Sequence, residues 1–389
     1  MKPRHTIAAL VAAIAIAIYF LLTPAQPPDA PAPVASTDAG KQTTSPVPPP
    51  GVPASTAAGK SSAGASNKKP GIDWERFARM LETGPSTAPG DSWPRPTAAD
   101  IDRFIAKRGE SAANLVAAFE CGHDRRWITR ALELFPNDPR VLLAAIGSSD
   151  PGAAADSPEG RRAAAARKEL IGRFKAAAPD NPLPWLFAAQ DLFKAKQTGE
   201  AIAEIRDALQ RPGFYIYGSE RIAAARQIYE DIGLQPLEAE IIAAFGLALP
   251  HMSAANQSSR GLMALQKSAV ESGDTAAAED AIKLTYSLGR MFATPEASRT
   301  LIGQLVGTSM ERRALEALPP DARRDYLPVT PQQRIAEMDR QKQLLRDLTP
   351  LTDALLRSKD EPTIAEYFRR NSTDGELSAL TWLKAQQKK

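Results

Sequence analysis

Residues that could do catalytic or metal chemistry are few in this 389-residue chain. Cys121, His123 and Asp124 form the only cluster with metal-ligand character, in the string Cys-Gly-His-Asp. Zinc needs three or four ligands at suitable spacing, and no second half-site accompanies this string. Gly122 and Asp124 are instead typical of a turn between two helices. The sequence therefore predicts no metal site and no cofactor.

Nucleophilic catalysis has equally little support. The histidines are His5, His123 and His251, and no HExxH, GxSxG, Walker A or GxGxxG string is present. A Ser–His–Asp triad would have to be assembled from distant positions, with His123 or His251 as its base. We therefore predict no catalytic and no cofactor-binding residue, and we expect a protein that is not an enzyme.

One carboxylate resembles a catalytic residue. Many peptidoglycan-cleaving transglycosylases combine a helical superhelix with a Glu-Ser motif and a nearby Gly-Leu-Met string, and this chain has Glu110-Ser111 and a Gly-Leu-Met string at 261–263. In that family the two strings lie within one small domain, whereas about 150 residues separate them here. A general acid also needs a pKa raised by burial or by a partner. We interpret the match as chance and keep glycan cleavage as a lesser alternative.

The strongest pattern in the chain is a pair of amphipathic helices over 180–209. Gly199 is predicted to lie in the turn between them, where a side chain would crowd the reversal. Apolar residues of mixed size form one stripe on each helix, at Trp185, Leu186, Ala189, Leu192 and Phe193 in the first and at Ala201, Ile202, Ile205, Ala208 and Leu209 in the second.

This unit resembles the tetratricopeptide repeat. The matching positions are Trp185, Ala189 and Leu192 in the first helix and Ala201, Ile205 and Ala208 in the second. The family's turn glycine normally comes earlier than Gly199, and its closing proline would fall on Gly213. The resemblance implies stacked helical hairpins whose small residues let neighbouring helices approach closely and whose concave face binds other proteins.

Weaker relatives of this unit lie on both sides of it. Upstream, Ile128, Ala131 and Pro136 repeat the end of a unit; downstream, Ala278 and Ile282 repeat a second helix, with Thr285 in place of an alanine. Units at uneven spacing predict an all-α fold, an irregular α-solenoid of tetratricopeptide-like helical hairpins. An ordinary all-α domain with alanine at its helix contacts remains the alternative.

The N-terminal residues predict a membrane anchor. Lys2 and Arg4 precede an uninterrupted apolar run over 7–22, which would make a helix about 24 Å long. We predict an uncleaved signal anchor at 1–23, with a cleaved signal peptide as the alternative. Because basic residues stay cytoplasmic, the body would lie in a bacterial periplasm, beyond the inner membrane. A single cysteine, Cys121, allows no internal disulfide, which a large core can do without.

Four segments follow from composition and helix signals. After the anchor we predict a disordered, Pro/Ala-rich linker at 24–72, a helical repeat-like domain at 73–320 and a C-terminal helical cap at 321–389. Within the domain, 214–217 (Phe-Tyr-Ile-Tyr) is too short for a sheet and is interpreted as a packed connection, with a groove lining as the alternative. Helix-start signals stand at Thr97 with Asp100, at Ser157 with Pro158 and at Thr330 with Pro331 and Gln333.

The predicted helix boundaries are specific enough to be tested. In the domain they are 74–81, 98–107, 110–120, 124–135 and 139–147. In the cap, a helix begins at Thr330 and ends at Leu348, with Gln341 and Lys342 interrupting its apolar seam. Shorter helices are predicted at 351–358, 362–370 and 375–386.

Charge and architecture together favour a binding protein. The net charge is +3, of which the region from residue 71 onward carries about −1, so no nucleic-acid partner is expected. We predict a membrane-anchored, non-enzymatic scaffold that binds a protein or peptide, with no small-molecule substrate. The alternative is a membrane-tethered folding helper, since the layout resembles lipase-specific foldases. Their signature motif is missing, and the string 324–326 (Arg-Asp-Tyr) is too short to represent it.

Overall fold

The computed structural model describes residues 72, 74–75, 95–149, 157–293 and 299–387. Every regular element in these ranges is a helix, which confirms the predicted all-α class. The predicted anchor at 1–23, nearly all of the linker at 24–72 and most of the helix at 74–81 lie outside the described residues. Among the described helices, none combines the length and apolarity needed to span a membrane.

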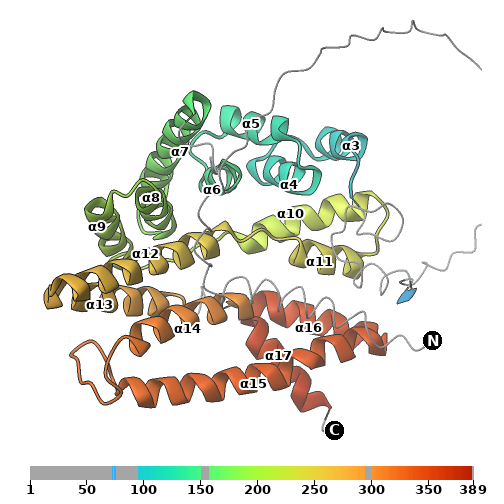
Figure 1. Cartoon of the computed structure of the whole chain (residues 1–389). Coiled ribbons are helices and arrows are strands. Elements are labelled where there is room, and N and C mark those ends of the chain that lie inside the picture. The colour runs from blue at the N-terminus through green and yellow to red at the C-terminus, as the bar shows by residue number, and fades with distance from the viewer. Residues whose placement is uncertain (1–71, 73, 76–94, 150–156, 294–298, 388–389) are drawn as a thin grey trace, which may run out of the picture.

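The first tier of helices runs from α3 to α9, and each helix contacts the next one along the chain (Figure 1). Such nearest-neighbour packing buries the apolar stripe of each helix against its successor. The bounds are α3 Ala98–Arg108, α4 Ala112–Gly122, α5 Arg125–Leu134, α6 Pro139–Ser148, α7 Pro158–Ala177, α8 Leu183–Lys194 and α9 Thr198–Leu209.

The second tier turns back along the first. It comprises α10 (Gly218–Asp231), α11 (Pro236–Phe245), α12 (Pro250–Ser272) and α13 (Thr275–Met291). Helix α10 packs on α3 and α4, while α12 packs on α8 and α13 on α9. These contacts join helices far apart in sequence, so the body is thicker than a single row of stacked hairpins (Figure 1).

The third tier contains the C-terminal helices. It comprises α14 (Leu301–Glu316), α15 (Pro331–Ser358), α16 (Glu361–Asp374) and α17 (Glu376–Gln386). Helix α14 packs on α13, α16 and α17 pack on each other, and α16 also touches α11. The tier is therefore attached to the second tier at two places, through α14 and through α16 (Figure 1).

The predicted helix starts are confirmed. Thr97 and Asp100 form a reciprocal capping box before α3, and Thr330 and Gln333 form another before α15. Ser157 accepts a hydrogen bond from the Gly160 N–H and begins α7. These signals are local, because a side chain satisfies a backbone group only two or three residues away.

The predicted end of α15 at Leu348 is wrong, and 351–358 is not a separate helix. Helix α15 runs through Pro350 to Ser358. An internal proline costs one backbone hydrogen bond. Here Leu348 and Leu355 lie on either side of it in the same apolar core as α16 and α17, so burial on both sides holds the helix together. The helices predicted at 362–370 and 375–386 are present as α16 and α17.

The alanine-rich unit over 180–209 forms the predicted helix pair, α8 and α9, which pack on each other. Ala189, Ala201, Ile205 and Ala208 are completely buried. The prediction for Gly199 is wrong, because this residue lies inside α9 and a side chain there would meet nothing within 4 Å. The reversal instead uses Lys196, whose φ is 60°.

Candidate functional site

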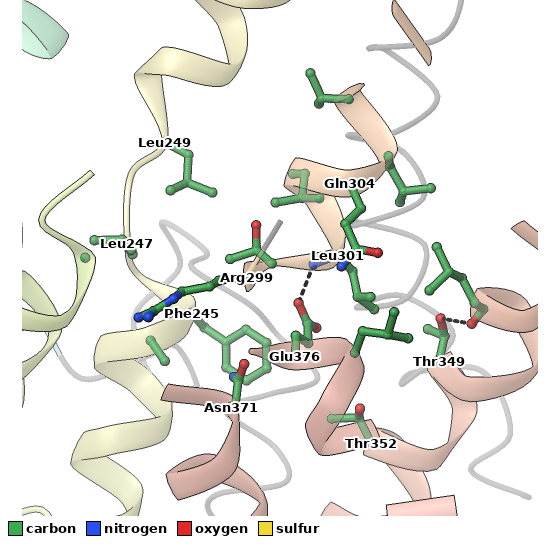
Figure 2. A pocket seen from close by; sticks show the side chains of 18 of the residues that line it. Phe245, Leu247, Leu249, Arg299, Leu301, Gln304, Thr349, Thr352, Asn371 and Glu376 are labelled. Atoms are coloured by element: carbon green, nitrogen blue, oxygen red, sulfur yellow. Dashed lines mark hydrogen bonds between the residues drawn. The ribbon is translucent and has the colours of Figure 1, made fainter. Parts of the chain in front are cut away.

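A large cavity opens between the second and third tiers, and we call it the interhelical groove. Its volume is about 2260 Å³. Figure 2 shows one part of it, and Phe245, Arg299 and Glu376 are among the lining residues labelled there. Much of the lining is apolar and only partly buried, and it includes Phe245, Leu247 and Leu249 at the α11–α12 connection, Leu301, Ile302 and Leu305 on α14, and Leu344, Leu345 and Leu356 on α15.

Helix α15 forms one wall of the groove because its two ends pack in different places. Met338 belongs to a core shared with α13 and α14, whereas Leu348 and Leu355 belong to the core built with α16 and α17. Between Met338 and Leu348 no residue of the helix is buried. The middle of the helix therefore crosses open space, and Leu344 is 44% exposed there.

The segment 214–217 is both a packed connection and part of the groove lining, the two roles considered from the sequence. Phe214 is buried and meets the ring of Phe292 edge-on at 5.1 Å between centroids, so it plugs a contact between tiers. Tyr215 lines the groove and is 52% exposed. An extended backbone alternates its side chains between two faces, which explains why neighbouring aromatic residues differ so strongly in burial.

Carboxylates that line the groove are largely neutralised by neighbours. Five of them pair with an arginine: Glu240 with Arg226, Glu311 and Glu337 with Arg334, Asp339 with Arg312, and Asp353 with Arg357. These pairs tie adjacent helices or successive helical turns together. The lining also contains Glu220, whose side chain makes no such pair within the described chain, and Glu376, which bonds to a backbone N–H group.

Several cations of the groove have no such partner. Within the described part of the chain, the side chains of Arg299, Lys342, Arg346 and Lys359 make no hydrogen bond or ion pair. Lys342 and Arg346 lie one helical turn apart in the open middle of α15. The groove thus combines an apolar lining with an excess of unpaired positive charge over the unpaired carboxylate of Glu220.

Glu376 joins α14 to α17 at the edge of the groove. Its Oε2 accepts a hydrogen bond of 2.8 Å from the backbone N–H of Leu301, the first residue of α14 (Figure 2). A carboxylate is favourable at a helix N-terminus, where backbone N–H groups lack partners. Burial nevertheless raises the pKa of Glu376, and the bond to Leu301 opposes that shift. We assign this residue to holding α14 and α17 together.

The cluster Cys121, His123 and Asp124 forms the predicted turn. His123 ends α4 in the left-handed conformation with φ of 55°, and Asp124 caps α5 by accepting a bond of 2.9 Å from the Arg126 N–H. Burial and the neighbouring Glu120 charge raise the pKa of the Cys121 thiol to about 12. Nowhere in the described residues do three His, Cys, Asp or Glu side chains converge in the manner of a metal site.

Glu110 and the 261–263 string serve different helix contacts. The Glu110 carboxylate is partly exposed and lies 2.8 Å from the Arg130 guanidinium. The hydrogen bond from Arg130 lowers the pKa of Glu110, which is opposite to the shift a general acid needs. Gly261 belongs to α12 and lies against the ring of Phe193, so its lack of a side chain serves the contact with α8.

Two residues of the string 324–326 bond to a carboxylate on α13. The Arg324 guanidinium lies 2.6 Å from the Glu279 carboxylate on α13, and the Tyr326 hydroxyl donates to the same oxygen at 2.8 Å. The two residues therefore fix the α14–α15 connection to the second tier. His251, by contrast, is fully buried, and within the described chain neither of its ring nitrogens has a hydrogen-bond partner.

No protein-family model matches this chain, and neither the curated proteins nor the solved structures contain a match. The groove itself was missed from the sequence, because it arises where the second and third tiers meet. One signal for it was present. Gln341 and Lys342 interrupt the apolar seam of α15, and this is where the helix leaves both cores.

Proposed function

We propose that this protein is a membrane-anchored, non-enzymatic scaffold whose helical body, an irregular solenoid of tetratricopeptide-like hairpins, binds a protein or peptide segment in the bacterial periplasm. The observation that carries the proposal is the interhelical groove, with its partly exposed apolar walls on α11, α14 and α15. Burying such walls against a partner is favourable by about 25 cal/mol per Å² of apolar surface.

The dimensions of the groove support a polypeptide rather than a small metabolite. Pockets for small ligands usually have volumes of about 300–1000 Å³, whereas this groove has about 2260 Å³. Most of its walls are helices, and helical repeats commonly bind extended or helical segments on such faces. The apolar run over 7–22 and the Pro/Ala-rich segment after it support the anchored, periplasmic arrangement.

Site-specific photo-cross-linking in cells that produce the full chain tests the proposal. A photoreactive residue would replace Tyr215 or Leu344, which are 52% and 44% exposed in the groove, or Val270, which is 58% exposed on α12 and does not line it. Discrete adducts that contain a partner should form at Tyr215 and Leu344 and not at Val270. Adducts of equal yield at all three positions, or none at the groove, would contradict a binding role for this surface.

A further inference from the structure

The charge of the groove narrows the chemistry of its partner. Five of the carboxylates in its lining are paired with arginines, Glu376 bonds to a backbone N–H group, and Glu220 alone has no partner in the described chain. The cations Arg299, Lys342, Arg346 and Lys359 have no partner in the described chain. Cations next to partly exposed apolar walls attract a segment that presents carboxylates beside an apolar face, because complementary charge speeds encounter and fixes the register of binding.

From this charge pattern we infer that the interhelical groove binds an acidic amphipathic helix of a partner protein. This inference rests on the proposed function and adds the chemistry of the partner. Helix α15 offers Leu345 and Leu356 to the apolar face of such a segment, and it offers Lys342 and Arg346 to the carboxylates at the edge. A helical partner fits because most of the described walls are helices, and no β-strand in the described residues offers an edge for strand addition.

A pair of synthetic peptides supplies the probes. Each would have about 18 residues, corresponding to about 27 Å of helix, with leucines at i, i+3, i+4 and i+7. One peptide carries glutamates beside the leucine stripe, and its twin carries lysines at the same positions. The full chain in detergent should bind the glutamate peptide at least roughly ten-fold more tightly than the lysine peptide, and added salt should reduce this difference.

Charge reversal on α15 locates the binding. The double variant K342E/R346E should lose roughly ten-fold in affinity for the glutamate peptide and gain affinity for the lysine peptide. A matched control, R162E/K168E, makes the same charge change at exposed residues of α7, outside the groove, and should bind as the unmodified chain does. A thermal unfolding midpoint within about 2 °C of the parent would show that K342E/R346E is folded.

Three results would overturn the inference. The lysine peptide could bind as tightly as its twin, the α15 reversal could have no more effect than the α7 reversal, or vesicles with anionic lipids could bind through Lys342 and Arg346 while the glutamate peptide does not. The cross-linking experiment separates the two proposals. Partner adducts at Leu344 together with no preference for the glutamate peptide would reject only the acidic helix, whereas missing adducts would also reject the scaffold.

Discussion

Helix α14 has two very different neighbours. On one side it crosses α13 at Gly289 and Gly307, so closely that a side-chain carbon on Gly289 would lie 2.8 Å from the Gly307 carbonyl oxygen. On the other side it is connected to α15, whose middle crosses open space with Leu344 exposed. The two sides of α14 therefore differ in how closely the neighbouring helix packs. Small residues close the contacts that hold the tiers together, and ion pairs hold the groove at its edges.

Disrupting the closed contact should have the largest effect. We expect Gly289→Val to lower the free energy of unfolding by more than about 3 kcal/mol, because the new Cβ would already overlap backbone atoms of Gly307 and Glu311 on α14. Urea unfolding followed by circular dichroism measures this. The control is Gly172→Ala in α7, where a side chain would meet nothing within 4 Å, and it should stabilise by about 0.5–1 kcal/mol. A gain of stability in Gly289→Val similar to that of Gly172→Ala would show that helix propensity, and not the crossing, decides.

The ion pair at the edge of the groove should have the next largest effect. Glu311 is 2% exposed, and its carboxylate lies 2.8 Å from Arg334 on α15. We expect Arg334→Met to cost about 2 kcal/mol, because it leaves a buried charge with only Arg290 nearby at 4.0 Å. The double variant E311M/R334M should recover most of that loss, as measured by the same unfolding experiment. A double variant no more stable than the single one would contradict this explanation.

The buried His251 of the second tier should make the free energy of unfolding depend on pH. Burial and the neighbouring Arg221 charge lower its pKa to about 3, whereas an unfolded histidine titrates near 6.5. Between these two pKa values the unfolded state binds more protons at this histidine than the folded state does. The contribution of His251 to the free energy of unfolding therefore falls as the pH falls, by about 1.4 kcal/mol per pH unit. We expect His251→Leu to raise stability by about 1 kcal/mol at pH 7 and to flatten the loss between pH 6 and pH 4.

Unfolding measured at pH 7, 6, 5 and 4 checks this prediction. The control is His123→Asn, because His123 is exposed and asparagine tolerates its positive φ. The control should keep the pH dependence of the parent. An unchanged slope in His251→Leu would mean that other groups govern the acid sensitivity.

Substitutions in the open middle of α15 should have the smallest effect on stability. We expect Leu344→Gln to change the free energy of unfolding by less than about 0.5 kcal/mol, since the side chain is already 44% exposed. The same substitution should weaken binding of the glutamate peptide. A loss of stability similar to that of Arg334→Met would show that the middle of α15 is part of a core.

Local signals predicted much of this structure, and long-range contacts explain what they missed. The caps at Thr97, Ser157 and Thr330 were predictable because each depends on neighbours within three residues. The continuation of α15 through Pro350 was not, because it depends on packing with α16 and α17. The groove depends on α10 returning to α3 and α4 and on the third tier attaching at two places. The periodicity of apolar residues along the sequence does not predict these contacts between helices that are far apart in the chain.

Binding of a partner requires the interhelical groove to be open in the free protein, and thiol labelling measures this directly. Cys121 provides a low background, because its pKa is raised to about 12. Leu305→Cys places a thiol on the groove side of α14, and Ala314→Cys places one at a fully buried position of the same helix. We predict that a bulky maleimide reacts much faster with Cys at 305 than with Cys at 314, and that the glutamate peptide protects the former. Equal, slow labelling at both positions would contradict an open binding groove, because the groove would then be filled by the chain itself.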